Sequence, residues 1–291
     1  MDALDIWGVL LPYNWALKAR GSVFPYFCTV LQGEIEPIKV RFLLLEGWQT
    51  LQNYLHTRQD HFFGVYSSPM ELPHFELIVL KSGELKLYRH DTGYLPQEVT
   101  GGAQYELAVK LLWEAYGVML RLESDQELPM KYSQDGAMFA RVEKASGEWE
   151  DQPLPLIPVR PYTEKVSLSK AEVKKASDLP FLPKEALAVD FRLVTGLFTQ
   201  EKRPRTVYEL VAFDHSSKRE VIRTRMSVVP EAGLKAMWEN MPGEFLHRLI
   251  QLGKIPGELH LCSGRVFRFL RPLCIELPIK LIMHDKLDEL A

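Results

Sequence analysis

The chain has 291 residues, 46% hydrophobic and 25% charged, and a formal net charge of −3 at pH 7, which is typical of an ordinary globular protein. Its three cysteines contain no CxxC pair, which excludes a disulfide scaffold and a cysteine-rich zinc site. No apolar run approaches the roughly 20 residues of a membrane span, and residues 1–15 offer no signal-peptide cleavage site. We therefore expect a cytoplasmic protein with no membrane partner.

Charge is divided unevenly along the chain. Residues 1–154 carry 13 Lys and Arg against 21 Asp and Glu, so their net charge is 13 − 21 = −8. Residues 155–291 carry 22 against 17, so their net charge is 22 − 17 = +5. Opposite charges indicate either two domains that attract each other or a basic half that approaches an anionic partner.

Prolines mark the boundary between two predicted domains. Four prolines lie between residues 153 and 161, and each favours extended structure in the residue before it. The sequence therefore predicts an N-terminal α+β domain over residues 1–150, a proline-rich linker over 151–166 and a C-terminal α/β domain over 167–291.

The N-terminal half alternates strand-like segments with two helical ones. In order, the predicted elements are a hairpin over residues 24–45, a helix over 46–57, a hairpin over 75–89, an amphipathic helix over 103–122 and a hairpin over 137–151. Four histidines, His56, His61, His74 and His90, fall in or near its loops without zinc-like spacing. We expect them to be scattered surface residues.

The C-terminal half has a clear element order. After a short helix over residues 167–180, the predicted elements are strands over 186–198, 206–214 and 219–229, a helix over 232–253, a strand over 257–262, a helix over 263–277 and a strand over 279–284. We expect Pro242 and Gly243 to kink or split the long helix. A compact strand–helix–strand crossover implies parallel pairing. The result is a mixed five-stranded sheet in βββαβαβ order, which resembles the ribonuclease H-like fold.

Enzymes of the ribonuclease H-like superfamily hold two divalent metals with clustered acids, which gives this half one catalytic hypothesis. Asp190 lies where the first-strand acid is expected, and Glu239 and Asp285 are candidates to complete the set. The fourth strand ends at His260 and Cys262 without an acid, so the hard oxygen ligand that Mg²⁺ prefers is missing there. The alternative is that Asp190 lies at the sheet surface or accepts from a backbone amide.

Two further patterns have a chemical and a structural interpretation. Cys262 and Arg268 have the spacing of a cysteine-phosphatase loop, but its interior is bulky, so we expect Cys262 to be buried and inert, with Ser263 capping the next helix. Arg223 and Arg225 share one face of the third strand and could follow a phosphate backbone. No aromatic residues that could stack on bases interleave with these arginines. We therefore favour the interpretation that their charge protects an edge strand from pairing with another chain.

Several segments together are similar to a group of uncharacterised bacterial proteins with paired domains of unknown function. They are FPYFCTVLQGE with EGWQTLQNYL, the loop YRHDTGYLPQEVT, the strand AVDFRL, and KIPGELHL with LPIKLIMHDKLDEL. The resemblance spans nearly the whole chain. It implies a two-domain layout and an α/β C-terminal domain, and no activity.

Two functions follow as hypotheses. The first is a non-catalytic binding or regulatory protein without cofactor or resident metal. Its partner, a protein or an anionic ligand, would bind between the domains near Asp91 and Tyr94. These two residues lie in a tight loop that contains Gly93. The alternative is a metal-dependent nuclease or phosphodiesterase that uses Mg²⁺ or Mn²⁺ at a degenerate site around Asp190. Nucleic acid is a partner that the pattern permits but does not favour.

Overall fold

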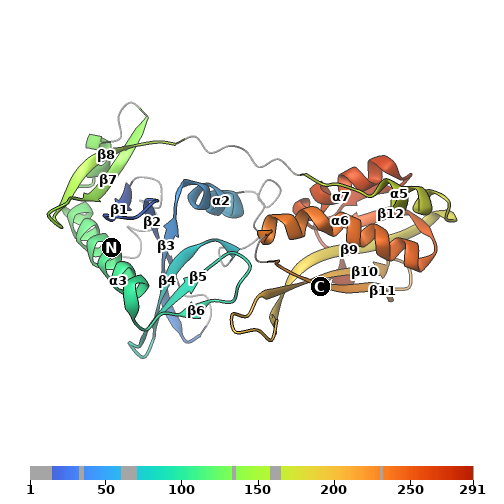
Figure 1. The fold of residues 1–291 in the computed structure, drawn as a ribbon, viewed down its shortest axis with the longest axis horizontal. Coiled ribbons are helices and arrows are strands. Elements are labelled where there is room, and N and C mark those ends of the chain that lie inside the picture. Colours follow the sequence, from blue (N-terminus) through green and yellow to red (C-terminus); the bar gives the residue numbers. More distant parts are fainter. Residues whose placement is uncertain are drawn as a thin grey trace. The chain divides into compact units, whose positions relative to one another are not determined.

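The computed structural model describes residues 15–32, 36–59, 71–132, 136–157, 165–229 and 232–290. These residues form two compact units, each with its own sheet (Figure 1). The second unit includes the short segment Thr92–Leu95 as well as the C-terminal half. No helix within the described ranges is long and apolar enough to cross a membrane.

An eight-stranded sheet forms the centre of the first unit. Its strand order is β6-β5-β4-β3-β2-β1-β7-β8, and the pair β1–β7 is parallel. The strands are β1 (Trp15–Lys18), β2 (Tyr26–Gln32), β3 (Ile38–Glu46), β4 (His74–Leu80), β5 (Leu85–His90), β6 (Gln97–Glu98), β7 (Ala137–Glu143) and β8 (Trp149–Pro155), with the short helix α4 (Leu128–Tyr132) before β7. The three predicted hairpins are confirmed as the antiparallel pairs β2–β3, β4–β5 and β7–β8.

Two helices pack against opposite faces of this sheet (Figure 1). They are α2 (Trp48–Gln59) and α3 (Gly102–Ser124). Phe27 of β2 contacts Trp48 of α2, with ring centroids 4.9 Å apart. Its neighbour Cys28 points the other way, because successive strand residues alternate between faces, and joins the apolar core under α3.

The structure corrects two expectations for the first unit. The predicted linker does not begin at residue 151, because Trp149–Pro155 form β8 and pair with β7. Two of the prolines are tolerated there because β8 is an edge strand and need not donate on its open side. His74 and His90 are not surface residues, since they are 0% and 1% exposed.

The second unit contains a mixed five-stranded sheet, as the sequence predicts. Its order is β11-β10-β9-β12-β13, with β9, β10 and β11 antiparallel and with β12 parallel to both β9 and β13. The strands are β9 (Phe181–Phe198), β10 (Thr206–Asp214), β11 (Glu220–Ser227), β12 (Ile255–Leu261) and β13 (Lys280–Met283).

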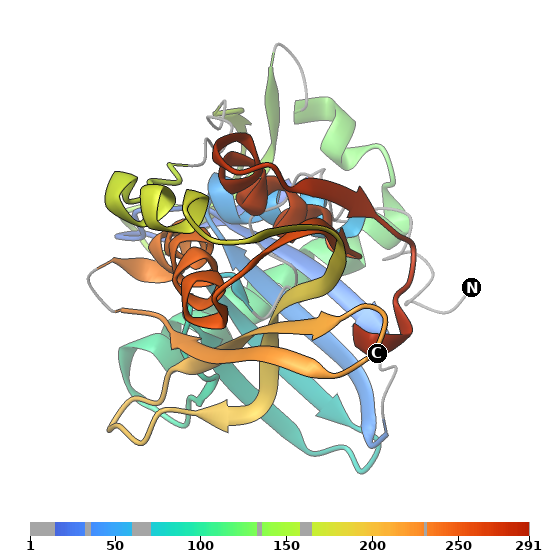
Figure 2. The same ribbon diagram turned by 90° about the vertical axis from the view of Figure 1, so that its right-hand side faces the viewer.

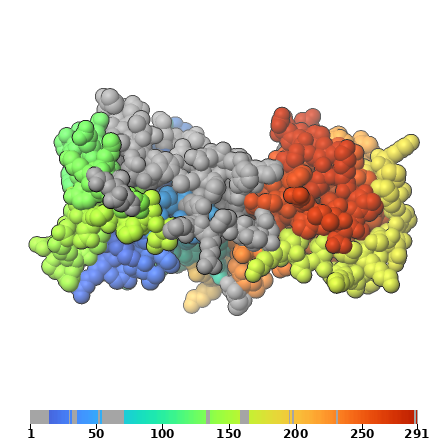
Figure 3. Space-filling model, turned by 90° about the horizontal axis from the view of Figure 1, so that it is seen from above, coloured from blue at the N-terminus to red at the C-terminus, as the bar shows by residue number. Residues whose placement is uncertain are grey.

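Three helices, α5 (Lys170–Ser177), α6 (Gly233–Leu252) and α7 (Gly264–Glu276), gather on one side of this sheet (Figures 1 and 2). In the view from above, the red C-terminal residues and the yellow-green residues around α5 are exposed on this face of the unit (Figure 3). Ser263 caps α7 as expected, and Ser169 caps α5. Of the two outcomes expected at Pro242, a kink or a split, the split is excluded, because α6 continues through Pro242 as one helix that packs on the core from its first turn to its last.

Candidate functional site

The acids of the metal-dependent hypothesis lie on different sides of the second sheet. Phe191 packs its ring against Trp238 of α6, with centroids 4.7 Å apart, so Phe191 faces the helix layer. Asp190, the preceding residue on β9, therefore points to the opposite face. Glu239 is on α6 and accepts a hydrogen bond from the backbone amide of Lys165, at 2.9 Å. The strand and helix geometry thus separates Asp190 from Glu239.

Asp190 has a local partner instead. Its carboxylate accepts from the backbone amide of Phe191, at 2.8 Å, as the structural alternative expected. Burial raises the pKa of Asp190, against the opposing effects of this hydrogen bond and of the Arg192 charge. Asp285 follows β13 and is exposed. Within the described ranges, no convergent group of three metal-binding side chains includes Asp190, Glu239 or Asp285.

The arginines of β11 are bound by a carboxylate. Arg223 and Arg225 both donate to Glu209 of β10, at 2.8 and 2.9 Å, and Arg223 also donates to Glu220. These hydrogen bonds hold the pKa of Glu209 below its usual value, with Arg225 as the first contributor. β11 is one of the two edge strands of the sheet, as predicted. The arrangement fits the interpretation that the arginines protect an edge strand, because the Glu209 carboxylate already neutralises positive charge that would otherwise attract a phosphate.

The two candidate loop residues belong to different units. Asp91 lies in the first unit and forms an ion pair with Arg89, at 3.0 Å. Tyr94 lies in the second unit, where the Arg203 guanidinium stands 4.2 Å from its ring centroid. Each residue therefore has a partner inside its own unit.

The turn between β12 and α7 is a capped helix start. Ser263 Oγ accepts from the amide of Val266, at 3.3 Å. Arg265 is 2% exposed and its guanidinium lies 3.4 Å from the ring centroid of Trp238, so one arginine of the phosphatase-like loop is part of the core. The expectation that Cys262 is buried is wrong: it lies beyond the last residue of β12 and is exposed.

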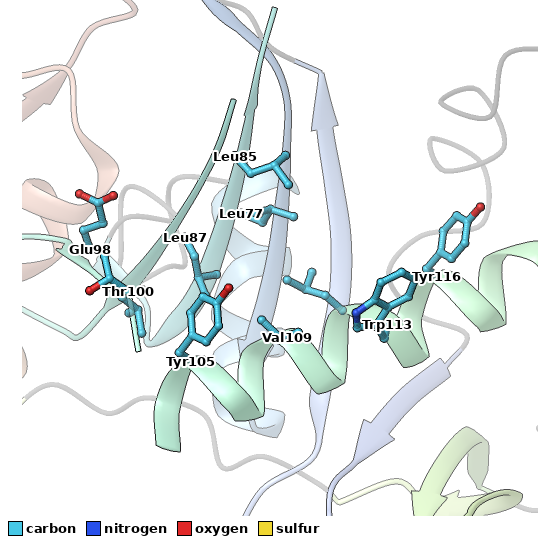
Figure 4. A pocket seen from close by; sticks show the side chains of 11 residues that line it. Leu77, Leu85, Leu87, Glu98, Thr100, Tyr105, Val109, Trp113 and Tyr116 are labelled. Carbon is cyan, nitrogen blue, oxygen red and sulfur yellow. The ribbon is translucent and has the colours of Figure 1, made fainter. Parts of the chain in front are cut away.

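A groove lies between α3 and the β4–β5 hairpin and is a candidate binding site (Figure 4). It has a volume of about 760 Å³. The sheet side contributes Leu77, Leu85 and Leu87, and the helix side contributes Tyr105 and Trp113, among other apolar residues. Volumes of this order are typical of ligand-binding clefts.

The groove exists because α3 carries two apolar stripes. Its buried stripe, which includes Leu111 and Val118, packs on the sheet. A second stripe faces the groove and continues past it: Tyr105, Val109, Leu112, Trp113, Tyr116 and Leu120. Trp113 is 70% exposed and Tyr116 is 50% exposed. Large apolar residues that follow one another on a surface mark interaction sites, whereas isolated ones do not.

Few polar groups line the groove. The hydroxyls of Tyr105 and Tyr116 lie on the helix side, and Glu98 and Thr100 lie at the end where β6 leads into α3 (Figure 4). Such a lining supplies apolar contact with a small number of orienting hydrogen bonds.

The sequence predicted α3 as an amphipathic helix but not the groove. The available signal was the width of the apolar pattern, since residues 105, 109, 112, 113, 116 and 120 repeat at helical spacing beside the core stripe. A second apolar stripe on a surface helix is a signal for an interaction site.

Comparison with known protein families gives a match within the second unit. Residues 172–291 match the family model described as a domain of unknown function (DUF6930). No match was found among curated proteins or among solved structures. The α/β C-terminal half is therefore similar to an uncharacterised domain family.

Proposed function

We propose that this protein is a non-catalytic binding module and that the α3 groove receives an amphipathic helical segment of a partner protein. The observation that carries the proposal is the exposed second stripe of α3. Aromatic residues such as Trp113 and Tyr116 are enriched in binding hot spots because they bury a large area with few rotatable bonds.

The length of the stripe favours a polypeptide over a small molecule. From Tyr105 to Leu120 the stripe follows four turns of helix, which correspond to about 22 Å at about 1.5 Å per residue. A drug-sized ligand would cover part of this length, whereas an amphipathic helix laid along the groove would cover all of it.

The charge of the surrounding half favours a basic partner. Residues 1–154 have a net charge of 13 − 21 = −8, and Glu98 lies at the rim of the groove. A net negative charge on the half that carries the groove accelerates association with segments whose polar face carries Lys or Arg.

We further propose that the second unit has ribonuclease H-like topology without the corresponding hydrolase chemistry. The order β11-β10-β9-β12-β13, with three antiparallel strands followed by two parallel crossovers, supports the topology. The separation of Asp190 from Glu239 argues against a two-metal nuclease or phosphodiesterase, because that chemistry requires carboxylates that converge on both ions.

We place the protein in a bacterial cytoplasm. The bacterial assignment rests on the sequence resemblance alone. The compartment is supported by the sequence, whose three cysteines include no CxxC pair, as is usual in a reducing compartment.

The proposal is tested by calorimetric titration with a model peptide of about 16 residues, with leucines at i, i+3, i+4 and i+7 and lysines elsewhere. We expect one peptide per chain and at least tenfold weaker binding to Trp113→Glu. Ile275→Glu is the matched control, because Ile275 is 74% exposed on α7 of the other unit, and it should bind like the wild type.

A second peptide of the same composition, with leucines at alternate positions, tests the helical requirement. It should bind at least tenfold more weakly than the helical peptide. Equal binding of the helical peptide to the wild type and to Trp113→Glu would contradict the proposed site.

A further inference from the structure

Three buried side chains with metal-binding chemistry converge on the first sheet. His74 and Glu76 lie two residues apart on β4, so they point to the same face, and His90 of β5 is the register partner of His74. One ligand atom from each residue lies within 4.8 Å of the other two. The three residues are 0%, 3% and 1% exposed.

His74 is held in the tautomer that a metal requires. Its Nδ1 lies 2.7 Å from the carbonyl oxygen of Leu72, which can only accept, so Nδ1 carries the proton. Nε2 is then unprotonated and carries a lone pair, and it is buried without a hydrogen-bond partner among the described residues. Burial, together with the neighbouring His90, lowers the pKa of His74 to about 3, so the ring is neutral.

Glu76 is ionised in this buried position. One of its oxygens is paired with Arg41, and the other lies 2.7 Å from His90 Nε2. Burial alone would raise its pKa, but the hydrogen bonds from His90 and Arg41 outweigh burial and lower the pKa to about 2. A carboxylate only accepts, so His90 donates through Nε2.

The hydrogen bonds of this cluster leave two ring nitrogens unsatisfied within the described part of the chain. They are His74 Nε2 and His90 Nδ1. A buried polar atom without a partner is destabilising, because it loses its hydrogen bonds to water and gains none in the protein. Stability alone does not explain a histidine pair at this position, because apolar residues would stack between the two strands without that cost.

We propose that this cluster is a binding site for one divalent cation of the zinc class, held by His74 Nε2, His90 Nε2 and Glu76 Oε2. On binding, the His90 ring proton moves from Nε2 to Nδ1, so that Nε2 offers its lone pair to the cation and the ring stays neutral. Two imidazoles and one carboxylate are a donor set that suits zinc better than magnesium or calcium.

The neighbours of the cluster match the outer partners of a metal site. The Leu72 carbonyl orients His74 through Nδ1, and Arg41 holds the second oxygen of Glu76. Ligating histidines usually donate their other ring nitrogen in this way, and ligating carboxylates are themselves hydrogen-bonded. The rings of His74 and His90 are stacked, with centroids 4.1 Å apart and planes 13° apart, so the cation binds as the rings tilt towards it.

The site is separate from the α3 groove and has a structural role. His74 and Glu76 alternate with Phe75 and Leu77, which face α3, so the cluster lies on the opposite face of the sheet. Its ligands come from both strands of the β4–β5 hairpin, so the cation would fix the pairing of the two strands.

A second histidine cluster provides a matched control. In the second unit, His260 contacts Glu258 through Nε2 at 3.1 Å and His284 through Nδ1 at 3.0 Å. Both ring nitrogens of His260 therefore have partners, and the ligand atoms there do not converge as those of His74, Glu76 and His90 do. His284→Ala removes one histidine of this control cluster.

The test is titration of the full chain, without an affinity tag, with Zn²⁺ alone and with Co²⁺ alone after treatment with a chelator. We expect one ion per chain, a Co²⁺ visible spectrum of tetrahedral nitrogen and oxygen ligands, and a higher unfolding temperature that the chelator reverses. His74→Ala and Glu76→Gln should weaken Zn²⁺ binding at least tenfold, whereas His284→Ala should bind like the wild type.

Folding of each variant is checked by circular dichroism, and the stoichiometry and Co²⁺ spectrum of the wild type do not depend on any variant. The proposal is overturned if the wild type binds neither Zn²⁺ nor Co²⁺ more tightly than with a millimolar dissociation constant. It is also overturned if His74→Ala binds as the wild type does or if binding is lost in His284→Ala.

Discussion

Gly257 of β12 lies against the backbone of Pro183 in β9, so closely that a Cβ on Gly257 would stand 2.3 Å from the Pro183 carbonyl oxygen. The parallel pairing of the two strands is irregular at this point, with a register shift between Pro256 and Glu258. A glycine at such a position allows two backbones to approach where any side chain would separate them.

We expect Gly257→Ala to lower the free energy of unfolding by about 1–3 kcal/mol, because the strands must move apart to accept the methyl group. Denaturant titration measures the change. Gly243→Ala in α6 is the control, since nothing lies within 4 Å of its added Cβ, and alanine there should be neutral or stabilising by up to about 1 kcal/mol. Equal stability of the two variants would contradict the close approach.

Local patterns predicted most of the elements, whereas the meeting of distant residues was not predictable from them. Apolar alternation located the β4–β5 hairpin, and helical spacing located α3. The same hairpin, closed by the turn at residues 81–84, places His74 opposite His90. Counting outward from that turn along both strands would therefore have paired the two histidines. Separation in sequence made these histidines look unrelated.

Burial was the least predictable property of single residues. Cys262 ends an apolar strand pattern, yet it lies one residue beyond β12, where the chain turns into α7. Asp190 could be assigned to a strand from its neighbours, but its face depends on where α6 packs, which only the long-range contact of Phe191 with Trp238 decides. The direction of a side chain therefore required the tertiary structure.

The three cysteines should differ in reactivity. Burial raises the pKa of both Cys28 and Cys274 to about 12, so their thiolate fraction at neutral pH is very small. Cys262 is exposed. We expect an aromatic disulfide reagent to modify one thiol per native chain and three per unfolded chain. Cys262→Ser should leave none reactive in the native state, and native modification of that variant would contradict the burial of the other two.

Asp214 should stabilise the fold at neutral pH. Hydrogen bonds from the Ser217 amide and the Ser216 hydroxyl, which close the β10–β11 turn, hold the pKa of Asp214 at about 2. The unfolded value is about 3.9, so its contribution is complete above that value and is lost as the pH falls towards 2. Thermal unfolding of Asp214→Asn should therefore show a lower midpoint than the wild type at pH 7, and the difference should shrink in acid.

Asp190 should have the opposite effect. Burial raises its folded-state pKa, so the folded chain binds the Asp190 proton more tightly than the unfolded chain does. The buried Asp190 side chain is thus tolerated as a neutral carboxyl group. As the pH rises through its folded-state pKa, ionisation of this group lowers the free energy of unfolding. Asp190→Asn keeps an oxygen that accepts from the Phe191 amide and removes the charge.

We expect Asp190→Asn to be more stable than the wild type at pH 7, with a difference that disappears at the acidic end of a series of denaturant titrations. The Asp214→Asn variant, measured in the same series, controls for general effects of charge removal because its difference has the reverse sign. A carboxylate that served as a metal ligand would give another result. The Asn variant would lose stability in the presence of Mg²⁺ or Mn²⁺ relative to the wild type, and that outcome would restore the metal-dependent hypothesis for this face of the sheet.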